Sequence, residues 1–182
     1  DRTMGRRERV LQGVSREEPD RGPGDRGGTT NTSMNLKSDQ EFKAHCGVVA
    51  EDRLAKKYTQ GVIVHEQILE AMDIDFRHLS AGRPDSNPET PVGDDSYRDE
   101  WGVLRRMPPG GLYYDVVESP LSGVITVRDI ANYRFPDPMD PGYTRGLRDR
   151  ALAIRESTDC AIALRTPSPF VHASQFLRGF ED

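Results

Sequence analysis

Hydrophobic positions recur at helical spacing in several segments of this chain of 182 residues. The clearest segment is 64–72, where apolar residues fall at i, i+4, i+5 and i+8. We predict a second helix from Ser38 that continues less clearly through 54–58, a third over 147–154, and a last helix opening at 168–169. The apolar side of the helix from Ser38 is formed by Phe42, Cys46 and Val49.

Two other patterns are typical of strands. Residues 73–79 alternate between polar and apolar, and the wholly apolar run 160–164 is expected for a strand buried on both faces. Segments 99–106 and 111–121 are predicted to form a β-hairpin through the turn 107–110. Because helices precede the two strands 73–79 and 160–164, the fold class is α/β with a parallel sheet.

Glycine and proline separate these elements into long loops, of which 20–33, 80–96 and 135–142 are the most pronounced. The acidic stretch 89–100 could bind a cation, although a solvated loop is the simpler interpretation. The glycine pairs at 27–28 and 110–111 lack a phosphate-loop pattern and are interpreted as turn residues.

The amino-acid composition argues against a membrane-spanning protein and against a nucleic-acid-binding protein. With 35% hydrophobic and 30% charged residues, the chain offers no run of about 20 apolar residues, so we expect no membrane span. The net charge of −5 and the interspersed arginines give no basic stripe, which argues against nucleic acid as the main partner. Since the chain has only two cysteines and no secretory signal pattern, we expect a soluble protein of the reducing cytoplasm.

Metal ligation is not indicated. His45 and Cys46 are adjacent, Cys160 is remote, and no zinc-ligand spacing occurs. We interpret both cysteines as small buried hydrophobic residues.

Candidate site residues lie near the ends of predicted strands, where α/β folds place their ligands. Arg77 suits an oxyanion and His78 can titrate near neutral pH, so both are candidates for catalysis. A purely structural role remains open for each. His172 and Gln175 share one face of the last helix, just beyond the strand at 160–164.

An ordered set of short segments resembles the uroporphyrinogen decarboxylase superfamily, in particular its decarboxylase-like branch. The N-terminal segment 17–23 (EEPDRGP) is similar to the family's approach to its first strand. The further segments are 75–79 (DFRHL), 99–102 (DEWG), 129–133 (DIANY), 135–138 (FPDP) and 168–182 (SPFVHASQFLRGFED).

The resemblance implies a TIM-type (β/α)8 barrel, which usually needs about 250 residues. Residues 1–182 would then be a partial barrel domain, the N-terminal half with a β-hairpin insertion, the C-terminal half being absent. A half-barrel exposes strand edges, so we expect marginal stability or self-association.

Departures from the decarboxylases bear on the activity that the resemblance implies. Those enzymes bind substrate carboxylates through an Arg-Gln-x-Gly-Arg stretch, where this chain reads RGGTTN over 26–31 and only Arg26 could substitute. Gln175 falls where they carry a catalytic-site tyrosine, and Asp85 is a displaced counterpart of their pyrrole-binding aspartate. Arg26, Asp85, His172 and Gln175 are therefore predicted to bind substrate.

The superfamily's other large branch resembles corrinoid-dependent methyltransferases, whose zinc ligands lie in the C-terminal half. We therefore expect corrinoid-linked methyl transfer or tetrapyrrole chemistry, with a tetrapyrrole or methyl donor and a corrinoid protein as partners. No cofactor is expected within residues 1–182, while zinc and corrinoid would serve a full-length methyltransferase. Porphyrinogen decarboxylation, a non-catalytic half-barrel paired with another chain, and a small-ligand-binding module remain alternatives.

Overall fold

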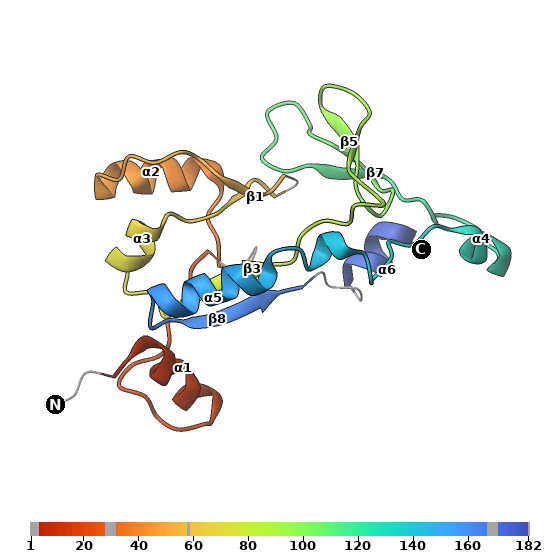
Figure 1. Cartoon of the computed structure of the whole chain (residues 1–182). Coiled ribbons are helices and arrows are strands. Elements are labelled where there is room, and N and C mark those ends of the chain that lie inside the picture. Colours follow the sequence, from red (N-terminus) through yellow and green to blue (C-terminus); the bar gives the residue numbers. More distant parts are fainter. Residues whose placement is uncertain (1–3, 28–31, 58, 167–170, 182) are drawn as a thin grey trace. The chain divides into compact units, whose positions relative to one another are not determined.

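The computed structural model describes residues 4–27, 32–57, 59–166 and 171–181, and contacts within the chain divide it into two compact units (Figure 1). Unit 1 is Asp1–Ser80 with Gly146–Arg165, and unit 2 is Ala81–Arg145 with Thr166–Asp182. Each unit combines helices with small sheets, which confirms the α/β class, and no sheet of the described residues closes into a barrel.

Unit 1 is built around a short parallel pair of strands. Its helices are α1 (Arg6–Val14), α2 (Leu36–Cys46), α3 (Glu66–Ala71) and α5 (Leu147–Ser157). Its strands are β1 (Leu54–Lys56), β2 (Gly61–Val62), β3 (Phe76–Ser80) and β8 (Ala161–Arg165).

The parallel pair is β3 with β8, in a register that runs from Phe76 opposite Ala161 to Ser80 opposite Arg165. Helix α5 leads into β8 and contacts both strands (Figure 1). This pairing confirms the expected parallel sheet, because a helix between two parallel strands is the usual connection.

The predicted helix over 64–72 is present as the shorter helix α3, and its apolar residues lie in the core of unit 1. Ile68 and Leu69 are buried on α3 and pack with Val62, Val64 and Ile74. Helix α2 adds Phe42 to this core, while Asn35 caps its first turn by accepting a hydrogen bond from the Ser38 amide at 2.9 Å.

A fully buried carboxylate organises the chain around β3. Asp75 is 0% exposed, and its side chain accepts hydrogen bonds from Arg9 at 2.5 Å, from Arg21 at 2.7 Å and from the Gly24 amide at 2.7 Å. The Asp75 backbone donates to Gly24 O at 3.0 Å and accepts from the Ala161 amide at 2.9 Å. Asp75 therefore joins α1, the segment 21–24 and β8 at the start of β3.

Unit 2 contains an antiparallel sheet of β4 (Thr90–Pro91), β5 (Ser96–Arg98), β6 (Leu104–Arg106) and β7 (Asp115–Glu118), paired in that order. The predicted hairpin is confirmed as β6 and β7. Helix α6 (Val171–Arg178) joins this unit, where the Leu121 amide donates to Leu177 O at 2.8 Å. Tyr97 and Val103 are the most deeply buried apolar side chains of unit 2.

Several local predictions were wrong, because strand pairing or helix capping overrides the hydrophobic periodicity of the segment. Residues 54–57 do not continue a helix, since Leu54–Lys56 pairs with β2, and residue 58 of the predicted segment lies outside the described residues. Gly47 ends α2 in the left-handed region at φ 67°, so Val49 lies outside the helix and is 100% exposed. Cys46, in the last turn, is exposed rather than buried, whereas Cys160 is buried as expected.

The predicted double-sided burial of β8 was also wrong. Leu164 is 55% exposed, because β8 belongs to a two-stranded sheet whose faces are only partly covered. Helix α4 (Val127–Asn132) and the short 3-10 helix Pro141–Tyr143 were not predicted. The signal for α4 is a capping box, in which Thr126 and Asp129 exchange side-chain and backbone hydrogen bonds. No helix of the described residues is long and apolar enough to cross a bilayer.

The Asp75→Asn substitution should destabilise unit 1 by about 3 kcal/mol, because it removes the buried negative charge that Arg9 and Arg21 share and leaves Arg9 with Asp20 alone. Urea unfolding followed by circular dichroism measures the loss. Asp149→Asn, on the exposed first turn of α5, is the matched control and should change stability by less than about 0.5 kcal/mol. Equal effects of the two substitutions would contradict the organising role of Asp75.

Candidate functional site

A cavity of about 550 Å³ lies beside β3 in unit 1. Its lining combines the loop residues Arg26 and Gly27 with Phe76, Arg77 and His78 of β3. Side chains from α3 and from the C-terminal end of α5 complete it. The sequence-predicted residues Arg26, Arg77 and His78 therefore meet in one cavity.

His78 is paired with a carboxylate that sequence reasoning missed. Its Nε2 lies 2.6 Å from Asp25 Oδ1, and the two residues are 53 positions apart in the chain. Because a carboxylate only accepts hydrogen bonds, Nε2 must carry the proton. In the neutral imidazole, Nδ1 is then the acceptor, and no described residue donates to it.

The aromatic ring of Phe76 fixes the other side of this imidazole. The two rings lie 6.0 Å apart between centroids, nearly parallel at 26°, as expected for residues i and i+2 on one face of a strand. The carboxylate and the phenyl ring thus hold His78 in one orientation, which suits either proton transfer or a directed hydrogen bond to a ligand.

Arg77 also lines the cavity, and its guanidinium is fully engaged. It is 5% exposed and donates to Glu66 at 2.6 Å and to Glu70 at 2.7 Å. Its Nη1 donates to Ile74 O and Phe76 O, so every N–H of the guanidinium has a partner. These contacts favour a positioning role for Arg77, and its predicted contact with an anionic ligand stays a prediction.

Arg26 and Gly27 bring the loop to the edge of the cavity. Gly27 has φ 86°, and a Cβ built there would lie 2.8 Å from Val64 Cγ2, so only glycine allows this approach. Arg26 is half-buried, and its guanidinium forms no ion pair with the described residues. It is therefore available to an anionic group in the cavity.

The remaining predicted substrate contacts belong to unit 2. Asp85 accepts from Arg145 Nη1 at 3.1 Å, and its amide donates to Asp140 at 2.9 Å. Gln175 is exposed on α6, and the side chain of His172 lies outside the described residues. Their part in a site with His78 stays a prediction.

Asp140 holds the loop that contains Asp85. Its carboxylate accepts from the backbone amides of Asp85, Ser86 and Gly142 at 2.8–3.0 Å. These hydrogen bonds, the one from Asp85 above all, hold the pKa of the Asp140 carboxyl well below its usual range. Asp85 therefore lies in a loop whose backbone is held by hydrogen bonds to Asp140.

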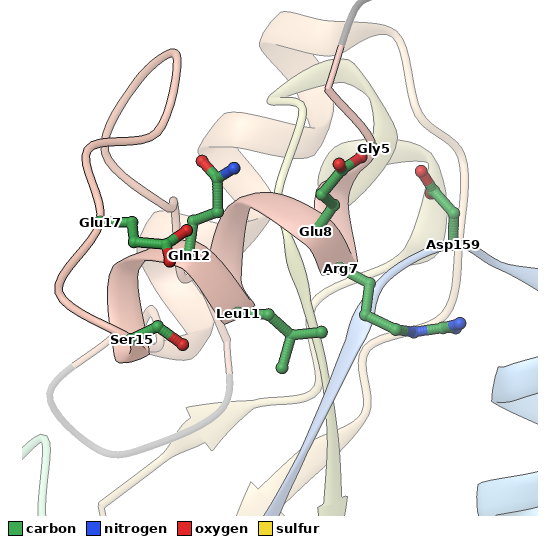
Figure 2. Close-up of a pocket in the computed structure, with 8 residues that line it drawn as sticks. All are labelled: Gly5, Arg7, Glu8, Leu11, Gln12, Ser15, Glu17 and Asp159. Atoms are coloured by element: carbon green, nitrogen blue, oxygen red, sulfur yellow. The ribbon is translucent and has the colours of Figure 1, made fainter.

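A second cavity, of about 510 Å³, runs along α1 (Figure 2). Figure 2 shows Arg7 and Asp159 at one end, Ser15 and Glu17 at the other, and Leu11 between them. Arg7 is engaged with Cys160 O at 3.1 Å and Thr158 O at 3.2 Å. Because no histidine lines this cavity and its one lining arginine is engaged, the cavity at β3 is the candidate functional site.

Among the residues that the structure describes, no group of three histidine, cysteine, aspartate or glutamate side chains could hold a metal ion. The cavity at β3 is lined by the imidazole of His78, the guanidinium groups of Arg26 and Arg77, and the carboxylates of Glu66 and Glu70.

Comparison with known proteins gives no match: no protein-family model, no curated protein and no solved structure is similar to this chain.

The Asp140→Asn substitution should lower the stability of unit 2 at neutral pH. A carboxylate whose pKa is depressed on folding contributes stability above its usual pKa of about 4, and this contribution is lost as the pH falls. The difference between wild type and variant should therefore shrink below about pH 4, as measured by urea unfolding from pH 7 to 3. A difference that is constant over this range would exclude the predicted role of the three amides.

Proposed function

We propose that this chain forms the N-terminal part of a (β/α)8-barrel enzyme. Within that class, we assign it to the decarboxylase-like branch of the uroporphyrinogen decarboxylase superfamily, which acts in corrinoid-linked methyl transfer or other tetrapyrrole chemistry. The observation that carries the proposal is the cavity at β3, which His78 lines while Asp25 orients its imidazole.

The strand arrangement supports the barrel. The repeating unit of such a barrel is a parallel strand pair with a helix leading from one strand to the next. β3 and β8 pair in parallel, and α5 precedes β8 and contacts both strands. The β4–β7 sheet between them in sequence corresponds to the expected hairpin insertion.

The segments that carry the resemblance also meet in space, which supports their origin in one family. Asp20 and Arg21 of the segment 17–23 join the ion pairs of Arg9 and Asp75. In unit 2, the Tyr133 hydroxyl of segment 129–133 donates to Trp101 O of segment 99–102. Short motifs that are each weak in sequence thus form mutual contacts.

The residues at β3 suggest how a ligand would be held. Arg26 would bind an anionic group, since its half-buried guanidinium forms no ion pair with the described residues and guanidinium groups bind oxyanions. His78, oriented by Asp25, would accept or deliver a proton at Nδ1 or bind a donor group of the ligand. Arg77 would keep Glu66 and Glu70 in place in the cavity lining.

Methyl transfer is the favoured activity, because the stretch 26–31 and Gln175 depart from the decarboxylase pattern. Zinc and corrinoid would supply the methyl-transfer chemistry. The described residues contain no ligand set for zinc, so the part of these residues is limited to binding and orienting the methyl donor or tetrapyrrole.

Porphyrinogen decarboxylation is the second candidate. It is favoured by the Asp25–His78 pair: once Nδ1 has taken up a proton from solvent, the imidazolium could deliver it to a pyrrole carbon after carbon dioxide leaves, while Arg26 anchors a carboxylate. A half-barrel paired with a second copy is the third, favoured by the exposure of Leu164 on β8. Light scattering that shows a monomer at every concentration would exclude this third candidate.

The His78→Gln substitution should weaken tetrapyrrole binding about tenfold, because a charge-assisted hydrogen-bond partner is removed from the cavity. Asp25→Asn should have a similar effect, since it frees the imidazole. Titration of the chain with uroporphyrin and, separately, with cobalamin measures the dissociation constants by absorbance. His45→Gln, in the exposed last turn of α2, is the matched control and should bind like wild type.

The two ligands also separate the candidates. Tighter binding of cobalamin favours methyl transfer, and tighter binding of uroporphyrin favours decarboxylation. If wild type binds neither ligand, or if His78→Gln and His45→Gln bind equally well, the proposed function is wrong.

A further inference from the structure

Arg165 occupies the carboxyl end of the parallel strand pair. It is the last residue of β8 and lies opposite Ser80, the last residue of β3. Ligands of open and closed parallel sheets bind at this end of the strands. Sequence reasoning placed no candidate here, because the apolar run over 160–164 stops one residue earlier.

The register places Arg165 on the same face as His78. Residues opposite each other in a parallel pair point to the same side, and successive residues alternate between sides. Ser80 shares the face of His78 and Phe76, and Arg165 therefore shares it through its register partner. The residue opposite His78 is Ala163, whose side chain is a single methyl group.

The charge of Arg165 has no counter-ion among the described residues. The buried arginines of unit 1 behave differently: Arg9 pairs with Asp20 and Asp75, and Arg77 pairs with Glu66 and Glu70. Arg165 is half-buried, and burial alone lowers the pKa of its guanidinium, with no carboxylate to raise it.

A second guanidinium reaches the same strand ends. Arg150 of α5 donates to Ser80 O at 3.2 Å, which places its charge beside the residue opposite Arg165. Two cations therefore converge on the carboxyl end of the β3–β8 pair, and no described carboxylate forms an ion pair with either of them. Such an arrangement suits a bound oxyanion, since guanidinium groups bind carboxylates and phosphates through parallel N–H donors.

We propose that Arg165 forms an oxyanion subsite at the carboxyl end of β3 and β8, which binds a carboxylate or phosphate of the ligand whose other end reaches His78. The existence of the subsite follows from the strand register and the charges. The identity of the full ligand as a tetrapyrrole or methyl donor rests on the proposed function.

The test is a nitrogen-15 NMR titration of the arginine Nε–Hε signals of the whole chain, with inorganic phosphate and with succinate at constant ionic strength. The Arg165 signal, assigned by its loss in Arg165→Gln, should shift to saturation with at least one probe. A larger shift with succinate identifies a carboxylate subsite, and a larger shift with phosphate identifies a phosphate subsite.

Variants sharpen the test. Arg165→Lys keeps the positive charge but lacks the planar guanidinium with its parallel N–H donors. The dissociation constant of this variant for the probe that shifts the Arg165 signal, measured by calorimetry, should therefore be about tenfold higher than that of wild type. Arg165→Gln should abolish saturable binding. Arg155→Gln, an exposed arginine on α5, is the matched control and should bind like wild type. Circular dichroism verifies that each variant is folded.

The subsite is disproved if neither probe shifts the Arg165 signal, or if Arg165→Gln binds both probes like wild type. Neither result changes the outcome of the uroporphyrin and cobalamin titrations that test His78. Conversely, if the titration that tests His78 shows no tetrapyrrole binding, the proposed function fails while the NMR result for Arg165 still holds. The two failures are therefore distinguishable.

Discussion

The carboxylate of Asp75 is the interaction on which unit 1 depends. It is fully buried, yet it receives hydrogen bonds from two guanidinium groups and one backbone amide. A buried charge is tolerated only when its partners replace the lost water, and leaving one partner alone is strongly unfavourable. Helix α1, the segment 21–24 and the start of β3 are therefore held together as one arrangement.

This constraint also builds the candidate site. Gly24 is held to Asp75 through both its amide and its carbonyl, and Asp25 is the next residue. The Asp25 carboxylate consequently reaches His78, three residues beyond Asp75. Ion pairs rather than apolar bulk carry much of this geometry, in keeping with a chain that is 30% charged and 35% hydrophobic.

Periodicity predicted the elements that are stabilised locally, and it could not predict those stabilised by distant partners. The helix at 64–72, the parallel strands and the hairpin of β6 and β7 follow from patterns within each segment. β1 depends on pairing with β2, and the Asp25–His78 pair joins residues 53 positions apart. Arg26, Arg77 and His78 line one cavity, but the pairing of Arg77 with Glu66 and Glu70 is a tertiary effect that no local pattern shows.

The most direct test is the tautomer of His78, read from its imidazole nitrogen-15 shifts in wild type and in the folded fraction of Asp75→Asn. If Asp75 positions the loop that carries Asp25, wild type shows the Nε2–H tautomer alone, and the variant shows a mixture of both tautomers. An Nδ1–H tautomer in wild type, or an unchanged single tautomer in the variant, would contradict the account.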